Sequence, residues 1–258
     1  MNLLPTKYFG KIKEIRSLKN YHLSFSYHNA EGEIPKHTHM NPYFSLNLGA
    51  AYLEKNSFNK KIIESGNVIL RPSNYEHQNT FTKELGLCLN IEVTSTSNYE
   101  VLELFKKKNI HFSCFEFLKI LTNTFDNYND NELDCLITET LLEKLDIKST
   151  NKIPSWYIQI ISKVRDDYSS SISLSSLADL VSLHPNYLAR KFKKISGTTL
   201  GDYIRNVRLE NACLDLYSNK RLTDISLETG FYDQSHFSNT FRAAFNMSPK
   251  ELRYFYLG

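Results

Sequence analysis

The chain has 258 residues, which is long enough for two domains that each bury a core of their own. Hydrophobic residues make up 41% of it and aromatic residues 13%, a composition that is typical of globular proteins and excludes a disordered chain. No apolar run approaches the ~18 residues of a membrane span, and the N-terminal stretch has no apolar export signal. We therefore expect a cytoplasmic protein with no membrane partner.

The net charge is only +3, but the charges are unevenly distributed. Residues 1–152 hold 18 basic and 18 acidic side chains, whereas the remainder holds 13 basic and 10 acidic ones. The positive excess therefore lies in the C-terminal part, and it has the sign that phosphate contacts require. The four cysteines are far apart and form no CxxC pair, so we expect buried free thiols in a reducing compartment: Cys88, Cys114, Cys135 and Cys213.

Residues 1–95 have the pattern of short β-strands separated by Gly, Asn, Pro and Ser turns. Five segments are rich in β-branched and aromatic residues and partly alternate: Tyr21–His28, Pro42–Ala50, Lys61–Glu64, Val68–Arg71 and Leu87–Val93. Their regular spacing predicts a small β-barrel or a jelly roll.

Three histidines lie in this region within two glycine-led motifs: Gly32-x4-His37-Thr38-His39 and Gly66-x5-Pro72-x4-His77. The pair resembles the two motifs of the cupin barrel, in which histidines of adjacent strands can hold a metal, usually with a carboxylate. No carboxylate follows His39 within residues 40–43, which counts against a catalytic metal. Three interpretations stay open: a metal site, a small-molecule pocket, or structural histidines. We expect no metal and no cofactor, and we take His37, His39, Arg71 and His77 as candidate effector-binding residues.

Residues 98–146 change to a helical period. The clearest helix carries apolar residues on one stripe at Leu133, Leu136, Ile137, Leu141 and Leu145. Two shorter apolar segments, 101–105 and 115–125, predict two further helices. Residues 146–154 are polar and end in Pro154, which predicts a linker. A stripe from Tyr157 to Tyr168 then predicts another helix.

Residues 172–253 contain two copies of one pattern. The first copy has apolar residues at i, i+3, i+4 and i+7, and the second repeats the spacing 48 positions later: Leu174, Leu177, Ala178, Val181, then Leu222, Ile225, Ser226, Thr229. A second pair of stripes is 49 positions apart, and its members are Leu188, Phe192 and Ile195, then Phe237, Phe241 and Phe245. Each copy therefore predicts a short helix, a turn and a second helix.

The outward face of each second helix is polar. It carries Asn186, Ala189, Arg190, Lys191, Lys193 and Lys194 in the first copy, and Gln234, Ser235, His236, Ser238, Asn239 and Arg242 in the second. Arg, Asn and Gln bond bidentately to base edges in the major groove, and Lys and Arg suit phosphates. An ordinary solvated bundle is the alternative, but two such faces in matched frames favour double-stranded DNA as the partner.

Residues 155–253 resemble the DNA-binding domain of the AraC/XylS family of bacterial transcription regulators. The residues that carry the resemblance are Leu188-x-Arg190-x-Phe192-Lys193, Gly197-Thr198, Tyr203, Arg208-Leu209, Ala212, Gly230-Phe231-x-Asp233-Gln234-Ser235-x-Phe237-Ser238-x-x-Phe241 and Ser248-Pro249. Four positions depart from the family pattern: His184 for a capping Ser, Ser226 for Ala, Asn239 for Arg and Asn246 for Gly. Asn246 is a mild change because Asn tolerates the left-handed conformation.

The resemblance implies an α+β protein. We expect a cupin-like β-barrel with following helices over residues 1–146, a linker over 147–154, and an all-α domain over 155–258 with two helix-turn-helix units joined by a linker helix. That helix, residues 199–217, would be a rod of roughly 28 Å, which suits recognition helices about one DNA turn apart. We expect Asp202 and Arg208 on this rod to be scaffold residues.

We therefore predict a DNA-binding transcription regulator. Asn186 and Arg190 would read bases in the first unit, as would Gln234, Ser235, Ser238 and Asn239 in the second. Lys191, Lys193, Lys194 and Arg242 would hold phosphates, with Ala189 and His236 completing the surface. The barrel would sense a small effector or mediate a homodimer, which helices in this region commonly form in the resembled family. RNA polymerase would be a partner of an activator.

Two alternatives differ in class from this prediction. One is a regulator without an effector, controlled by a protein partner or by its abundance. The other is a metal-dependent cupin enzyme with a DNA-binding tail, which the missing carboxylate disfavours. No Ser-His-Asp signature or phosphate-cradling Gly loop appears in the sequence, so we do not expect an enzyme.

Overall fold

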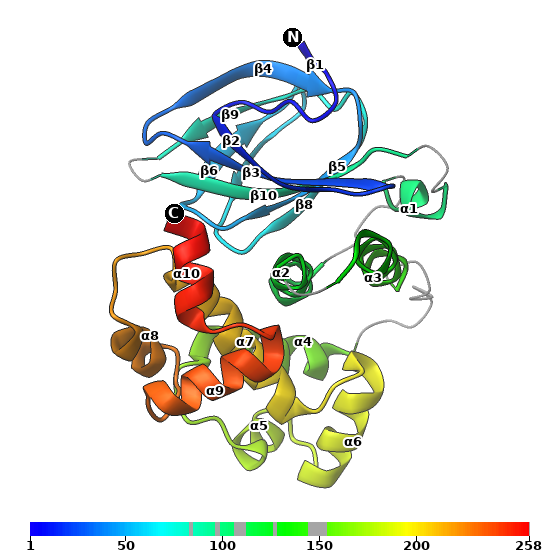
Figure 1. The fold of residues 1–258 in the computed structure, drawn as a ribbon. Helices are drawn as coiled ribbons and strands as arrows, with labels where there is room; N and C mark the ends of the chain where they lie inside the picture. Colours follow the sequence, from blue (N-terminus) through cyan, green and yellow to red (C-terminus); the bar gives the residue numbers. More distant parts are fainter. Residues whose placement is uncertain (83–84, 96–98, 106–111, 126–127, 144–153, 258) are drawn as a thin grey trace. The chain divides into compact units, whose positions relative to one another are not determined.

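The structure is a computed structural model that describes residues 1–82, 85–95, 99–105, 112–125, 128–143 and 154–257 (Figure 1). The chain divides into two compact units, Met1–Ile147 and Lys148–Gly258, which are described one at a time. Of the expected linker, residues 147–153 lie outside the described residues. No described helix is long and apolar enough to cross a membrane.

The first unit contains two five-stranded sheets. One has the order β1-β4-β9-β6-β7, with bounds Asn2–Leu3, Glu33–His39, His77–Phe81, Tyr52–Lys55 and Lys60–Ile63. The other has the order β2-β3-β10-β5-β8, with bounds Lys11–Ser17, Tyr21–His28, Gly86–Val93, Tyr43–Asn47 and Val68–Arg71. The expected α+β class is confirmed, and the strands form two sheets and not a closed barrel. Each sheet ends in edge strands, β1 and β7 or β2 and β8, and no described ladder joins the two sheets.

Three helices follow the sheets: α1 (Tyr99–Leu104), α2 (Cys114–Asn123) and α3 (Asp130–Leu142). Capping boxes start α2 at Ser113 and α3 at Asn129, and they satisfy backbone N–H groups that a helix start leaves unpaired. The predicted helices are thus confirmed, although Leu145 lies outside the described residues. The exposed Cys135 of α3 corrects the expectation that all four thiols are buried, because it lies on the helix face opposite the buried stripe.

Aromatic packing joins the helices to the second sheet. The Phe44 ring of β5 lies 5.4 Å from the ring of Phe112 and 5.9 Å from that of Phe117. Arg16 of β2 donates to the carbonyls of Thr124 and Tyr128, at 3.2 and 2.7 Å. Aromatic side chains therefore cover the helix-facing side of the second sheet, and β10 is buried along its whole length.

The second unit is helical throughout its described residues. Its helices are α4 (Ser155–Asp167), α5 (Leu174–Leu180), α6 (Pro185–Ser196), α7 (Leu200–Asp215), α8 (Leu222–Glu228), α9 (Gln234–Phe245) and α10 (Pro249–Leu257). One core cluster contains residues of α4, α5, α6 and α7. Its buried members are Ile160, Val164, Leu177, Ala178, Leu188, Phe192, Leu200 and Val207. A ladder of phenyl rings forms a second core around α9: Phe231, Phe237, Phe241 and Phe245.

The connecting helix α7 contacts α6 of the first pair and α8 of the second. It has 16 residues, so its length is about 24 Å at 1.5 Å per residue, somewhat shorter than expected from the sequence. The helix is followed by a turn, in which the Ser218 hydroxyl donates to the Asp215 carbonyl and accepts the Lys220 N–H.

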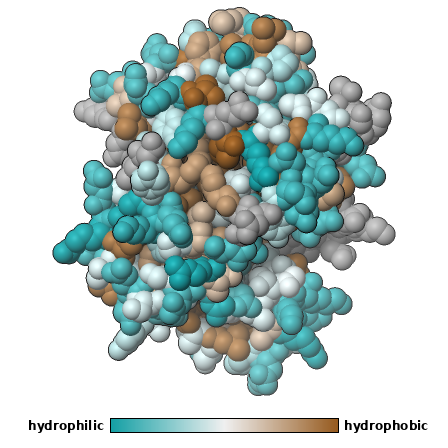
Figure 2. Space-filling view, in the orientation of Figure 1, coloured by the Kyte–Doolittle hydropathy of each residue, from teal (hydrophilic) through white to brown (hydrophobic). Residues whose placement is uncertain are grey.

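On the face seen in Figure 2, hydrophilic residues predominate and hydrophobic ones appear in small groups, as on most proteins.

Candidate nucleic-acid interface and buried histidine cluster

The first recognition helix, α6, has well-defined ends. His184 is its N-cap, and the Nδ1 atom of this side chain accepts the Asn186 N–H at 3.3 Å. Pro185 follows at the first helical position, where its missing N–H costs no hydrogen bond. Gly197 ends the helix with φ 75°, and its N–H donates to the Lys193 carbonyl. An imidazole thus replaces the hydroxyl that usually caps this helix.

The two faces of α6 differ as predicted in all but one position. Leu188 and Phe192 are fully buried, whereas Ile195, expected on the same stripe, is 41% exposed because it lies in the last turn, beyond the core cluster. The outward side chains of Asn186, Arg190, Lys193 and Lys194 are exposed, and those of Ala189 and Lys191 are half-buried.

Sequence reasoning missed Tyr187, which is 41% exposed on α6. The Lys191 ammonium lies 5.5 Å from the centre of its ring, and the Arg190 guanidinium lies 6.0 Å away. Such contacts orient a cationic side chain. The signal that was available was an aromatic residue outside the apolar stripe.

The second recognition helix, α9, begins after a turn that only glycine fits. Gly230 has φ 84°, and a Cβ atom there would lie 2.7 Å from the Ser169 carbonyl oxygen. Asp233 then caps the helix by accepting the His236 N–H at 2.7 Å. Asn246 ends it in the left-handed conformation with φ 56°, which confirms that Asn serves where the family usually has Gly.

The faces of α9 follow the prediction. Phe237, Phe241 and Phe245 are buried, whereas the outward side chains are exposed except for the half-buried Ser238: Gln234, Ser235, His236, Asn239 and Arg242. One of these side chains is already engaged within the unit, because Thr223 of α8 donates its hydroxyl to the Gln234 carbonyl oxygen at 2.8 Å. The outward face of α9 offers one cation, and that of α6 offers four.

Two polar side chains of α7 bond to neighbouring segments of the unit. Arg208 donates to the carbonyls of Tyr168 and Ser170, both at 2.8 Å, and the Asp202 carboxylate accepts the Thr199 hydroxyl at 2.6 Å. These contacts engage both side chains within the fold, as expected for scaffold residues.

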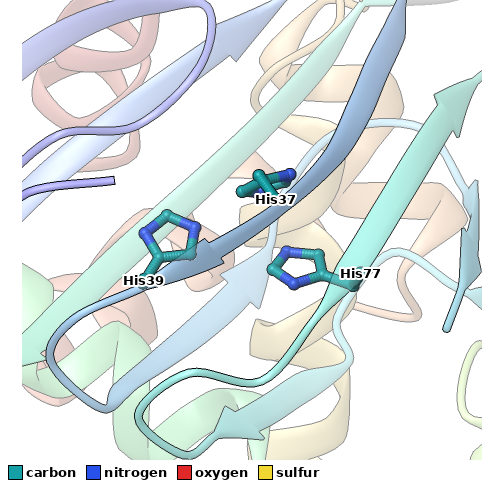
Figure 3. Close-up of side chains that lie close together, drawn as sticks. All are labelled: His37, His39 and His77. Carbon is teal, nitrogen blue, oxygen red and sulfur yellow. The ribbon is translucent and has the colours of Figure 1, made fainter. Parts of the chain in front are cut away.

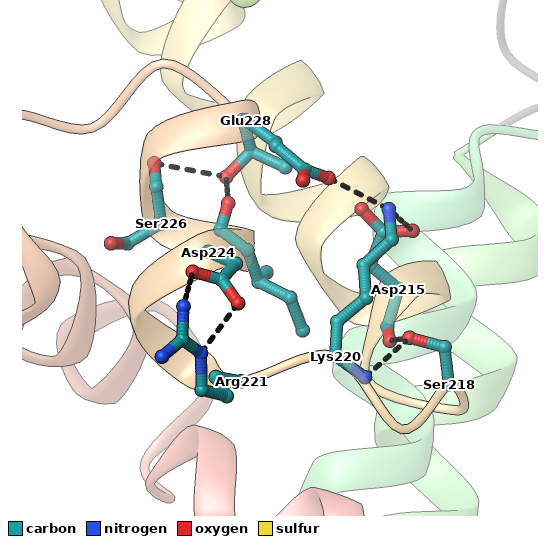
Figure 4. A network of polar contacts seen from close by, with 9 residues as sticks. Asp215, Ser218, Lys220, Arg221, Asp224, Ser226 and Glu228 are labelled. Atoms are coloured by element: carbon teal, nitrogen blue, oxygen red, sulfur yellow. Dashed lines mark hydrogen bonds and ion pairs between the residues drawn. The ribbon is translucent and has the colours of Figure 1, made fainter.

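Where α7 meets α8, the Lys220 ammonium bridges the carboxylates of Asp215 and Glu228, at 3.2 and 2.7 Å (Figure 4). Beside it, Arg221 forms a two-point ion pair with Asp224. Each exposed pair alone contributes little to stability. The Lys220 bridge links the connecting helix to α8, whereas the Arg221 pair is local to the start of α8.

In the β unit, the structure brings His37, His39 and His77 together (Figure 3). One ring nitrogen from each lies within 4.8 Å of the others, and all three side chains are buried. The sheet order explains the cluster, because β4 and β9 are neighbours and His37 pairs directly with His77.

Burial makes the three imidazoles neutral. It lowers the pKa of His39 to about 3 and that of His77 to about 2, and it also lowers the pKa of His37. The positive charge of Arg71 lowers the pKa of each ring further. Nδ1 of His37 donates to the Pro35 carbonyl at 2.8 Å, and Nδ1 of His77 to the Tyr75 carbonyl at 3.2 Å. Both rings therefore keep Nε2 as an unprotonated acceptor.

Arg71 is 2% exposed and lies beside the cluster, where it is already paired. Its guanidinium bonds to the Glu54 carboxylate through Nε, at 2.9 Å, and through Nη2, which also donates to the Tyr52 hydroxyl at 3.0 Å. Because Glu54 matches its charge, Arg71 leaves little net charge for an effector in this conformation.

The cavity around the cluster has a volume of about 30 Å³. The N-terminal segment covers it: the Tyr8 ring lies 5.0 Å from that of His39, and the Phe9 ring lies 4.9 Å from that of His37. Glu92 holds this segment by accepting the Thr6 N–H at 2.9 Å and the Tyr8 hydroxyl at 3.2 Å. A space of this size holds about two water molecules or one ion.

Three neutral imidazoles fit a transition-metal ion. The carbonyls that fix the tautomers of His37 and His77 are the kind of outer partner that orients metal-binding histidines. No carboxylate joins the three within the described residues, so the chain would supply three ligands.

Comparison with known proteins shows what the helical unit is similar to. Residues 177–254 match the family model described as a helix-turn-helix domain. The chain is 29% identical over 136 residues to an uncharacterized HTH-type transcriptional regulator of Staphylococcus aureus, covering 48% of this chain and 18% of that protein. It is 34% identical over 96 residues to the HTH-type transcriptional activator RhaS of Enterobacter sp. (strain 638), covering 37% of this chain and 34% of that one.

Among solved structures, ToxT of Vibrio cholerae aligns with 93% of this chain and 100% of its own, at 15% identity and a TM-score of 0.42. The C-terminal region of this chain is a helix-turn-helix domain of the AraC type. The chain spans only 18% and 34% of the two curated relatives, so these matches describe the domain and not whole proteins.

Proposed function

We propose that this chain is a sequence-specific DNA-binding transcription regulator. The observation that carries the proposal is the pair of exposed polar helix faces, on α6 and α9, held by one connecting helix. Helix-turn-helix proteins place such a face in the major groove, with the N-terminal residues of the helix at the base edges.

The exposed side chains divide by chemistry. Arg190 and Asn186 of α6 can bond bidentately to bases, as can Asn239 of α9, while Ser235 and Ser238 can donate or accept single bonds. Lys191, Lys193, Lys194 and Arg242 lie toward the other end of each helix and suit phosphates. Ala189 and His236 complete the surface.

Selection of bound DNA from a random pool tests this proposal. The wild-type chain should recover one sequence class, and Arg190→Ala should relax it at one position and cost about 1–3 kcal/mol. Arg190→Lys is the matched control, because it keeps the charge but loses the two-point geometry. It should bind random DNA like the wild type and discriminate like Arg190→Ala. Equal binding of all sequences by the wild type would refute the proposal.

We propose in addition that the β unit regulates DNA binding, and the histidine cluster favours a divalent transition-metal ion as its ligand. His37, His39 and His77 would hold the ion, which would cross-link β4 to β9 and so stabilise the unit. The volume of about 30 Å³ supports an ion over an organic effector, which would need Tyr8 and Phe9 to move away. Control by a protein partner or by abundance is the alternative if no ligand binds; a homodimer and, for an activator, RNA polymerase would be further partners.

Metal analysis of untagged protein tests the ion directly. Bound Zn, Ni or Fe should approach one equivalent in the wild type and fall in His77→Gln; less than about a tenth of an equivalent in the wild type would dismiss the site. His28→Gln is the control, because His28 lines the same cavity but bonds to Ser26 and stacks on Phe81. It should retain the metal.

A further inference from the structure

Gln234 is the first residue of α9, and its side chain is held from the preceding helix. The Thr223 hydroxyl of α8 donates to the Gln234 carbonyl oxygen, Oε1, at 2.8 Å. Both side chains are exposed, so this contact lies on the surface of the unit and not in its core. It links the two helices of the second helix-turn-helix pair across their turn.

Both partners of this contact are fixed in place by the backbone around them. The Thr223 carbonyl accepts the hydroxyl of the buried Ser226 at 2.7 Å, which anchors the first turn of α8. Asp233 caps α9 immediately before Gln234. In addition, the β-branched Thr223 has few χ1 rotamers, which limits the directions in which its hydroxyl can point.

The chemistry of an amide makes this contact relevant to base reading. A Gln side chain pairs with adenine through two bonds, one accepted by Oε1 from N6 and one donated by its NH₂ group to N7. Guanine O6 and N7 and thymine O4 are acceptors, so they require only the donor end. Once Thr223 holds Oε1 toward α8, the NH₂ group is the end that is left to meet a base.

We propose that Thr223 sets the base preference of Gln234, biasing it away from adenine and toward the acceptors of guanine or thymine. The inference rests on the proposed function, since it names what one side chain of that interface reads. A second lone pair on Oε1 means that adenine is disfavoured and not forbidden. Thr223 is thus a positioning residue, which acts through Gln234 without touching DNA.

The first helix-turn-helix pair lacks this contact. At the repeat offsets of 48 and 49 residues, Ser175 corresponds to Thr223 and Pro185 to Gln234. The proline side chain carries no amide group, so a hydroxyl at position 175 has no base-reading side chain to orient. Ser175→Ala is therefore a matched control for the removal of the Thr223 hydroxyl.

The test compares full-length variants in selection from a random DNA pool. Gln234→Ala first identifies the base pair that Gln234 reads, as the position whose preference is lost. At that position the wild type should favour guanine or thymine. Thr223→Val keeps the shape and removes the hydroxyl, so it should shift the preference toward adenine by about tenfold. Thr223→Ser keeps the hydroxyl and should retain the wild-type preference, as should Ser175→Ala.

Each contrary result has its own meaning. An unchanged preference in Thr223→Val overturns this inference and leaves the proposed function intact. So does a Gln234→Ala variant that selects the same sequence as the wild type. A wild-type chain that selects no sequence at all refutes the proposed function and this inference with it. Thr223→Val in the Gln234→Ala background should change nothing, and any shift there would mean that Thr223 acts by another route.

Discussion

At the scale of single residues, two glycines of the helical unit have the same backbone conformation but different surroundings. Gly197 and Gly230 have φ of 75° and 84°. An added Cβ would meet nothing within 4 Å at Gly197, whereas at Gly230 it would lie 2.7 Å from the Ser169 carbonyl oxygen and 3.0 Å from Arg208 Nε. Gly197 is therefore needed for its backbone conformation alone, and Gly230 also for packing.

We predict different effects for the two alanine substitutions. Gly197→Ala should lower the free energy of unfolding by about 1–2 kcal/mol, the cost of a left-handed non-glycine residue. Gly230→Ala adds a backbone clash, so its loss should exceed that of Gly197→Ala by about 1–3 kcal/mol. Urea unfolding followed by fluorescence of Trp156, the single tryptophan, measures both. Equal losses would show that the turn at Ser169 moves aside freely.

Buried histidines make a second prediction at this scale. The pKa is about 4 for His28, about 3 for His39 and about 2 for His77 in the folded chain, against about 6.5 in an unfolded one. A depressed folded pKa means that the unfolded state binds protons first as pH falls. The free energy of unfolding of the β unit therefore has its full value above pH ~6.5 and falls progressively below it.

In metal-free protein, His39 and His77 should each remove roughly 2–3 kcal/mol from the stability of the β unit between pH ~6.5 and ~4.5. Far-UV circular dichroism during urea unfolding reports this loss, and Trp156 fluorescence follows the helical unit in the same sample. His77→Gln should have a shallower pH dependence than the wild type. An identical slope in the two proteins would contradict the neutral, buried state of that ring.

At the scale of elements, the two recognition helices differ in charge. The outward face of α6 carries Arg190, Lys191, Lys193 and Lys194, and that of α9 carries Arg242. Each phosphate contact lowers the slope of log K against log salt concentration by about 0.9. Most of the salt dependence of DNA binding should therefore come from α6.

We predict that the double variant Lys193→Ala/Lys194→Ala reduces the magnitude of this slope by about 2, and that Arg242→Ala reduces it by about 1. Titration of one DNA duplex at several salt concentrations gives the slopes. The double Lys→Arg variant is the control, because it preserves the charge and should preserve the slope. A double alanine variant with an unchanged slope would place the two lysines off the phosphates.

How far the sequence predicted each element depends on how its apolar residues are spaced. The helical pairs and the Phe237–Phe241–Phe245 stripe followed from periodicity, and β3 and β8 were predicted with their observed bounds. Strands β4 and β9 were missed because they turn histidines and Asn79 inward, where an alternating pattern needs apolar residues. The histidine motifs nonetheless predicted the cluster that these strands build.

Other features of the two candidate sites depend on contacts between elements and have no local signal in the sequence. The bond from Thr223 to Gln234 joins positions 11 residues apart across a turn. The pairing of Arg71 with Glu54 spans 17 positions and two sheets. Exposure of Ile195 likewise reflects where the core ends and not where the apolar stripe ends. Spacing along one helix or strand does not contain this information.

At the scale of the whole molecule, we expect the helical unit to read two places on one duplex. The connecting helix α7, about 24 Å long, contacts the first pair through α6 and the second through α8. A rigid connection of this kind fixes the separation of the two recognition helices, and successive major grooves on one side of a duplex are ~34 Å apart.

Binding to duplexes with altered half-site spacing tests most directly whether the two recognition helices read one duplex at a fixed separation. Once selection has given the two half-sites, duplexes are made with zero, five or ten base pairs inserted between them. We predict tight binding only without an insertion, and a loss to the level of a single half-site with five or ten, because α7 can neither twist nor lengthen to follow. Affinity that is unchanged by the five-pair insertion would mean that only one helix reads DNA, and it would contradict the account.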